Sequence, residues 1–280
     1  IWAATFADES QVVGGYDNGE IRRWKIKDGQ QQGPTMQAIS AVHSIVVSQD
    51  GHWMVTGTGD GSHRTIVWNA ITHEKVHEFT EHHGWVTALD ISHDSTIFAT
   101  ADYFNAQIFS ITSGIRLLPP LPHHSIAGIK TPLVWSSDGQ QLLIANVGKI
   151  TRFDLSTSSS SEWLIHENQS PVYIASNGRF IACAAGPSVS LWDFVSHKQI
   201  SSVITHTSQI KSVALSPSGA YLACGNGRNI TIHNLREVLS LKYFDHGVSV
   251  RPLMELVSLT IIALRHAASS CFSAPACASE

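Results

Sequence analysis

The chain has 280 residues, of which 43% are hydrophobic and 14% are charged, and its formal net charge is −4. A chain of this length and composition can bury a large core, which excludes a mainly disordered polypeptide. The small negative charge offers no basic footprint for nucleic acid. The four cysteines show neither metal-binding nor disulfide spacing. We therefore predict no metal, no cofactor and a reduced, intracellular location in the cytoplasm or nucleus.

A tight polar turn recurs about every forty residues along nearly the whole chain. An Asp, Asn or Ser opens each turn, at Asp8, Asp50, Asp94, Asp138, Asn177 and Ser218. Successive positions are 42, 44, 44, 39 and 41 residues apart. A period of this size is typical of a propeller, a solenoid or another repeat array.

A second marker, which is aromatic in five of the six repeats, lies near the end of each repeat in the same phase. These markers are Trp24, Trp68, Phe109, Phe153, Trp192 and, in the sixth place, His233. A second polar turn precedes the marker by 7 residues, or by 8 in the second repeat. Because such intervals are too short for helices with their connections, the repeat predicts antiparallel strands joined by tight turns.

Four short strands are expected in each repeat. The first strand is β-branched or alternating, as in residues 86–91, and the second follows the first turn, as in 98–100. The third strand carries the marker, and a variable fourth strand, such as 75–79, leads to the next repeat. Four antiparallel strands in about forty residues form the blade of a β-propeller, so the chain is predicted to be all-β with about six four-stranded blades.

These repeats resemble the WD40 family, and most closely the repeat arrays of large fungal proteins. The Trp-Asp dipeptide of the family is present once intact and twice in altered form, at Trp192-Asp193, Trp68-Asn69 and Phe153-Asp154. The family's Gly-His element is reduced to its His, at His82 and His206. The resemblance covers roughly residues 1–238 and implies a WD40-like β-propeller that acts as a scaffold.

The resemblance also implies structural roles at the turns. The family's Asp–His–Ser/Thr–Trp hydrogen-bond tetrad corresponds in the third repeat to His82, Thr100, Asp102 and Phe109, where Phe replaces the Trp. The other expected structural residues are the turn and marker positions Asp17, Asp60, Trp24, Trp68, Trp192 and Asp193. We expect the aspartates to order their own turns rather than to contact a ligand.

Two segments depart from the repeat. The interval from His123 to Asp138 is 15 residues instead of 12, which fits either a three-residue bulge or two incomplete repeats joined by a deletion. A further repeat should begin at His246, but neither its later turns nor its marker appears in 247–280. The apolar run Leu253–Leu264 in this segment is too short to cross a membrane.

From these departures we predict a propeller over residues 1–238 and a non-repeat tail over 239–280. Because Ile1 already lies within an expected first strand, we expect the sequence to be a fragment of a longer protein. Six repeats leave two arrangements open, a closed ring of six blades or an incomplete ring of seven.

A scaffold and an enzyme are the two function classes to compare. The sequence has no Gly-x-Ser-x-Gly elbow, and adjacent His pairs such as His82-His83 chelate poorly. An enzyme with an active site in the central channel, of a hydrolase type, therefore stays only as the alternative. The rigid face of a propeller suits a peptide or a partner domain, anchored by exposed aromatic and Arg side chains.

Five residues are expected to lie on that face, at the loops that lead into first strands or between second and third strands. These candidate anchors are Tyr16, Trp85, Tyr103, Phe104 and Arg228. Packing against a neighbouring blade is the alternative role for each of them. We predict a protein or peptide partner, and no nucleic acid, membrane or metal.

Overall fold

The strands of each blade follow the chain order. The computed structural model describes residues 2–8, 10–25, 27–59, 61–122, 132–146, 148–165, 172–210, 212–216, 218–226 and 229–244. Blade one comprises β1 (Ala3–Asp8), β2 (Gln11–Gly15), β3 (Glu20–Lys25) and β4 (Gln31–Gln37). Blade two comprises β5 (Val42–Val47), β6 (Trp53–Thr58), β7 (Thr65–Asn69) and β8 (Lys75–Phe79). Blade three comprises β9 (Ala88–Ile91), β10 (Ile97–Ala101), β11 (Asn105–Ser110) and β12 (Leu121–Pro122).

The second half of the chain repeats this arrangement. Blade four comprises β13 (Leu133–Trp135), β14 (Gln141–Asn146), β15 (Lys149–Asp154) and β16 (Ser159–Leu164). Blade five comprises β17 (Val172–Ser176), β18 (Phe180–Ala185), β19 (Ser188–Asp193) and β20 (Ile204–Thr205). Blade six comprises β21 (Ser212–Leu215), β22 (Tyr221–Asn226) and β23 (Asn229–Asn234). Two short 3-10 helices follow, η1 (Leu235–Glu237) and η2 (Leu241–Tyr243).

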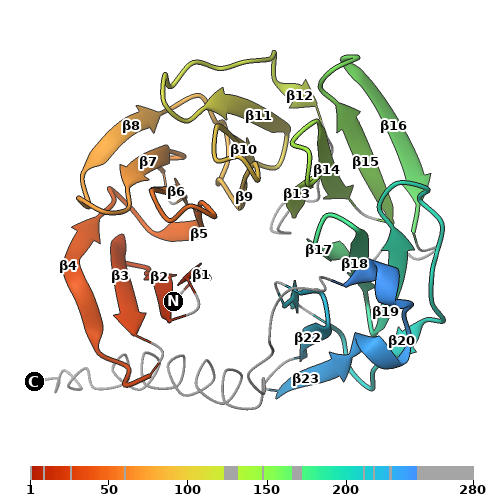
Figure 1. Ribbon diagram of the computed structural model, residues 1–280. Helices are drawn as coiled ribbons and strands as arrows, with labels where there is room; N and C mark the ends of the chain where they lie inside the picture. The colour runs from red at the N-terminus through yellow and green to blue at the C-terminus, as the bar shows by residue number, and fades with distance from the viewer. Residues whose placement is uncertain are drawn as a thin grey trace, which may run out of the picture.

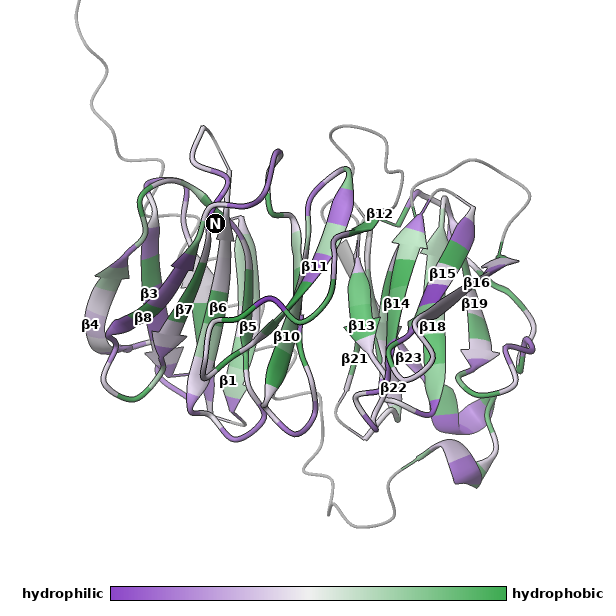
Figure 2. Ribbon diagram, turned by 90° about the horizontal axis from the view of Figure 1, so that it is seen from above, coloured by the Kyte–Doolittle hydropathy of each residue, from purple (hydrophilic) through white to green (hydrophobic). Residues whose placement is uncertain are grey.

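The blades lie around a ring, with the first strand of each blade toward the centre and the last strand outside (Figure 1). Inner strands such as β10 and β14 are largely hydrophobic, whereas the outer strand β8 is mostly hydrophilic (Figure 2). The prediction of an all-β propeller with six blades is confirmed, but in the part of the chain that the structure describes blade six has three strands rather than four. No helix among the described residues is long and apolar enough to cross a membrane.

The recurring first turn is closed by a short polar network. In blade two, the Ser48 hydroxyl and the backbone N–H of His52 donate to Oδ1 of Asp50 over 2.5 and 3.0 Å. Gly51 adopts a φ of 71°, which glycine accommodates without a Cβ clash. Blade four forms the same network around Asp138. The repeated turn in the sequence therefore reflects a repeated backbone geometry.

Five hydrophobic clusters fill five junctions between neighbouring blades. In blade two, Met54 pairs with the marker Trp68, and both are buried against blade one. In blade three the corresponding pair is Phe98 and Phe109, whose rings stack with centroids 5.3 Å apart against blade two. In each of these blades, the cross-strand row of side chains that contains the marker, here called the marker row, thus packs on the preceding blade.

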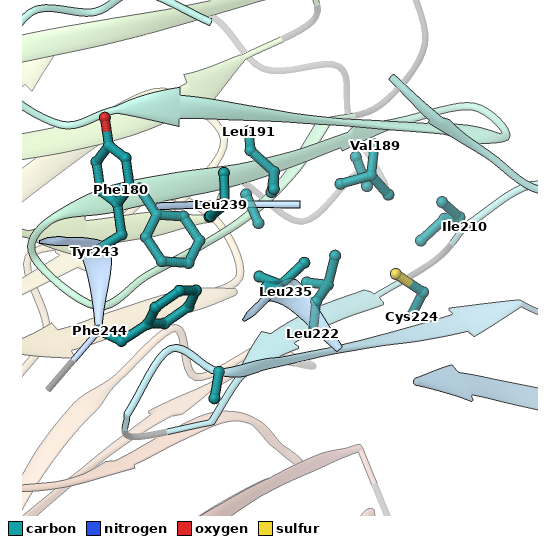
Figure 3. Close-up of a cluster of buried hydrophobic side chains, with 13 residues drawn as sticks. Phe180, Val189, Leu191, Ile210, Leu222, Cys224, Leu235, Leu239, Tyr243 and Phe244 are labelled. Carbon is teal, nitrogen blue, oxygen red and sulfur yellow. The ribbon is translucent and has the colours of Figure 1, made fainter. Parts of the chain in front are cut away.

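Residues beyond the predicted end of the propeller complete the last of these junctions. Leu239, Tyr243 and Phe244 are buried with Phe180 of blade five and Leu222 of blade six (Figure 3). The Tyr243 hydroxyl also donates to Oδ2 of Asp193 over 2.9 Å. The folded body therefore extends past the predicted boundary at residue 238 to at least Phe244. Residues 123–131 and 245–280, which include most of the two irregular segments, lie outside the described residues.

Blade one carries the same marker row without a preceding blade among the described residues. Phe6, Val12 and Trp24 are neighbours across β1, β2 and β3. Met54 and Trp68 of blade two, which correspond to Val12 and Trp24, are buried, whereas Val12 and Trp24 are half-buried and 52% of Phe6 is exposed. No cluster of described residues joins blade six to blade one. No neighbouring blade among the described residues therefore covers the apolar row of blade one.

We expect the isolated chain to self-associate through this row, because an accessible blade face has lost the apolar contacts that a neighbouring repeat supplies. Phe6→Ser should shift the chain toward monomer in light scattering. Leu164→Ser replaces an exposed leucine at the end of β16 and should leave the distribution unchanged. A wild-type chain that is monomeric and unfolds in one sharp transition would contradict this expectation.

Candidate interaction face

One end of the ring collects several aromatic side chains. We call this end the start face, since the first strand of each blade begins there and the turns between second and third strands lie beside it. Trp2, directly before β1, donates its indole N–H to Oδ1 of Asp17 over 2.7 Å. Its ring lies 5.2 Å from that of His43, which stacks in turn on Trp85 at 4.7 Å and 25°. A continuous row of ring contacts, which we call the His43 stack, therefore runs from blade one to the loop before blade three.

A glycine makes room for this stack. A Cβ at Gly59 would lie 2.6 Å from Cδ2 of His43 and 3.0 Å from Cγ of Trp85. Since such distances are shorter than real Cβ contacts, any larger residue at this position would displace the two rings. His43 itself is buried, while 51% of Trp2 and 37% of Trp85 are exposed. The stack thus presents two indole rings to solvent on a fixed support.

The turn between β10 and β11 extends the aromatic surface. A Cβ at Gly84 would lie 3.2 Å from Cδ2 of Tyr103 and 3.8 Å from Cε2 of Phe104, so the loop that carries Trp85 lies against this turn. Tyr103 is half-buried, whereas 57% of Phe104 is exposed. We call Trp2, Trp85 and Phe104 the aromatic patch.

A buried polar network fixes the two backbone segments at blade three that carry Trp85 and Phe104. Nδ1–H of His82 donates to Oδ2 of Asp102 over 3.1 Å, and Nε2 accepts from the Thr100 hydroxyl over 2.7 Å. The same carboxylate accepts the backbone N–H groups of His83 and Phe104 at 3.1 and 2.7 Å, and that of Asn105 at 2.8 Å. Asp102 therefore ties the loop before Trp85 to the turn of Phe104.

The charge state of Asp102 follows from these contacts. Burial raises the pKa of its carboxyl, but the hydrogen bonds from His82 and from the backbone of Asn105 and Phe104 outweigh burial and hold the pKa well below its ordinary value. The side chain is thus a carboxylate at neutral pH. Phe109, at the fourth tetrad position, forms no side-chain hydrogen bond and packs on Phe79 with ring centroids 4.4 Å apart.

The other expected structural residues take varied roles. Trp68 donates its indole N–H to Thr56 over 2.9 Å, and Trp192 donates to Ser190 over 2.7 Å. Asp193 accepts the backbone N–H of Ser196 at 2.7 Å and so closes the turn after β19. Trp24 lies half-buried in the row of blade one, and Asp17 is an exposed acceptor for Trp2.

The structure separates the five predicted anchors. Trp85, Tyr103 and Phe104 come together on the start face. Tyr16 is only 9% exposed, and the Arg22 guanidinium lies 5.2 Å above its ring. Arg228, like Asp60 among the structural residues, lies outside the described residues. Sequence reasoning missed Trp2 and His43, because neither stands at a repeating position.

Comparisons with known proteins agree with this architecture. A family model described as WD domain, G-beta repeat matches residues 33–66, 73–108 and 197–234. The chain is 26% identical over 245 residues to apoptotic protease-activating factor 1 of Homo sapiens, which covers 78% of this chain and 18% of that protein. It is 25% identical over 210 residues to a guanine nucleotide-binding protein subunit beta of Zea mays, with 69% and 55% covered. The chain thus spans less than two thirds of either relative.

A solved structure shows the same fold. The structure of U3-55K superimposes with a TM-score of 0.72 at 15% identity, covering 86% of this chain and 80% of that chain. Its blades and those described above share the propeller arrangement. The chain thus contains three segments that match the WD domain, G-beta repeat, and it folds as a β-propeller of six blades among the described residues.

Proposed function

We propose that the protein is a non-enzymatic scaffold that binds a peptide or partner domain at the aromatic patch of its start face. WD40 propellers generally mediate protein–protein interactions; of the two relatives above, one is named as a subunit and the other as a factor that activates a protease. An intracellular location, in the cytoplasm or the nucleus, belongs to the same proposal.

The observation that carries the proposal is the aromatic patch. Exposed Trp and Phe side chains on a rigid support are typical anchors of a binding interface, because they bury large apolar area at little cost in conformational entropy. Here the His43 stack and the Asp102 network fix the backbone on both sides of the patch. A partner would therefore meet a preformed surface.

The test compares two variants with matched changes at opposite ends of the ring. The double variant Trp85→Ala, Phe104→Ala removes two anchors of the patch. Ile71→Ala removes an exposed apolar side chain from the turn between β7 and β8, which lies at the other end. Each is used as bait in affinity capture with quantitative mass spectrometry, next to the wild-type chain.

Proteins captured by the wild type should be recovered at least tenfold less with the double variant. A loss of about this size is expected when a single hot-spot residue is truncated. Ile71→Ala should keep full recovery. Circular dichroism and melting curves must show both variants folded. Full recovery with the double variant, together with loss in Ile71→Ala, would move the binding surface to the opposite end of the ring.

A further inference from the structure

Three side chains that can ligate a metal converge in blade six. His206 follows β20, Cys224 lies on β22 and His233 lies on β23, and one ligand atom of each falls within 4.8 Å of the other two. The Nε2 atoms of the two histidines are 3.2 Å apart, and their rings meet edge to face with centroids at 5.0 Å. Among the described residues, this is the one group of three His, Cys, Asp or Glu side chains close enough to share an ion.

The repeat explains how these residues meet. The strand register places Cys224 and His233 of blade six at the positions of Thr100 and Phe109 in blade three, and His206 corresponds to His82. In blade three these positions support a hydrogen bond of 2.7 Å between imidazole and hydroxyl. Blade six has a thiol in place of the hydroxyl and an imidazole in place of the aromatic ring. The three corresponding positions in blade six therefore offer two nitrogen atoms and one sulfur atom as metal ligands.

We propose that His206, Cys224 and His233 bind a zinc ion. Zinc takes imidazole nitrogen at about 2.0–2.1 Å and thiolate sulfur at about 2.3 Å in tetrahedral geometry. Two nitrogens of such a site are about 3.3 Å apart, close to the 3.2 Å between the two Nε2 atoms. Sulfur and nitrogen would be about 3.6 Å apart, so Sγ has to approach by at most about 1.2 Å.

The surroundings suit a borderline-soft divalent ion. Cys224 is buried at the end of the hydrophobic cluster, near Ile210 (Figure 3), while both histidines are half-buried. Three protein ligands leave a fourth position, which a water molecule on the histidine side can take. An imidazole and thiolate set favours zinc over the hard cations magnesium and calcium, which prefer oxygen.

The protonation states are compatible with this assignment. Burial and the neighbouring His206 lower the pKa of His233, which favours the neutral imidazole that metal binding requires. Burial raises the pKa of the Cys224 thiol to about 11. Zinc binding therefore displaces the thiol proton to solvent, as metal sites with cysteine ligands do.

The site would connect the loop before β21 to the paired strands β22 and β23. His206 belongs to the loop before β21, whereas the other two ligands lie on β22 and β23. An ion there would tie the start of the blade to its last described strand. This role is independent of partner binding at the aromatic patch, which lies on blades one to three.

The test uses the 280-residue chain with Cys271→Ser and Cys277→Ser, so that the two cysteines outside the described residues cannot contribute. The protein is stripped with a chelator and titrated with Co²⁺, a spectroscopic substitute for Zn²⁺. We expect one equivalent of Co²⁺ to bind with a cobalt–thiolate charge-transfer band in the near ultraviolet. Zn²⁺ should then displace the cobalt and abolish the band.

Three variants identify the ligands. Cys224→Thr, which introduces the side chain of blades two and three, should lose the band and weaken Co²⁺ binding at least tenfold. His233→Phe, the side chain of blade three, should weaken binding similarly. Cys183→Thr changes the equivalent buried cysteine of blade five and should stay within twofold of the parent. Absence of the band in the folded parent, or its survival in Cys224→Thr, would overturn the proposal.

Discussion

Phe244→Ala is expected to lower the free energy of unfolding by about 3–5 kcal/mol, the usual loss when a fully buried Phe is truncated. The side chain lies beyond the last repeat, yet it is buried in the cluster between blades five and six with Phe180 and Leu222. Arg236 also lies 5.9 Å over its ring. Denaturant titration followed by circular dichroism measures the change.

Leu241→Ala is the matched control for this prediction. Leu241 begins the short helix η2, three residues before Phe244, but its side chain is exposed. Its truncation should change stability by no more than about 0.5 kcal/mol. Equal, small losses in both variants would show that the segment after β23 does not belong to the folded body.

Asp102→Ala should cost about 3 kcal/mol of stability. The carboxylate accepts one imidazole and three backbone N–H donors, most of them shielded from water. Each buried donor left without an acceptor costs on the order of 1–3 kcal/mol, although relaxation of the turn recovers part of the sum. The same change should loosen Phe104 and Trp85 and so weaken partner capture as well.

Asp94→Ala provides the comparison within the same blade. Asp94 closes the exposed first turn through Ser92 and Thr96, and its loss should cost about 1 kcal/mol or less. A pH series adds a second test for Asp102. Because the folded-state pKa of Asp102 is depressed, its stabilising effect is complete above about pH 4 and declines as the pH falls below that value. Similar losses in both variants at neutral pH would contradict the buried-network assignment.

The blades could be predicted from the sequence because the turn residues and the marker residues recur at regular intervals. Turn residues such as Asp50 and Gly51 are needed by the local backbone, and markers such as Trp68 fill a junction between blades that recurs along the chain. Turn geometry and packing between neighbouring blades both require particular residue types at a fixed spacing in the sequence, so the spacing reveals them. That information suffices for blade number and strand order.

The candidate sites depend on contacts between side chains that cannot be deduced from the spacing of residues in the sequence. Trp2 and His43 meet only because adjacent first strands bring them together at one end of the ring. His206 and Cys224 are 18 residues apart in sequence, and no short metal-binding motif contains them. His206 and His233 do occupy repeat positions, but spacing alone does not show that their side chains meet Cys224. The contacts within both groupings follow from the packed ring.

Every described blade is made from one uninterrupted stretch of chain, and among the described strands no sheet combines the beginning of the sequence with its end. Among the described residues, the blades thus form a curved row of modules in which each blade packs on its neighbours along the chain. Blades two to five are each clamped between two neighbours, whereas blades one and six are supported on one side by the described residues. In such a row, local opening begins at the outermost modules and the middle persists longest. The aromatic patch therefore combines Trp2, next to an outermost blade that should open early, with Phe104, on an interior blade that should open later.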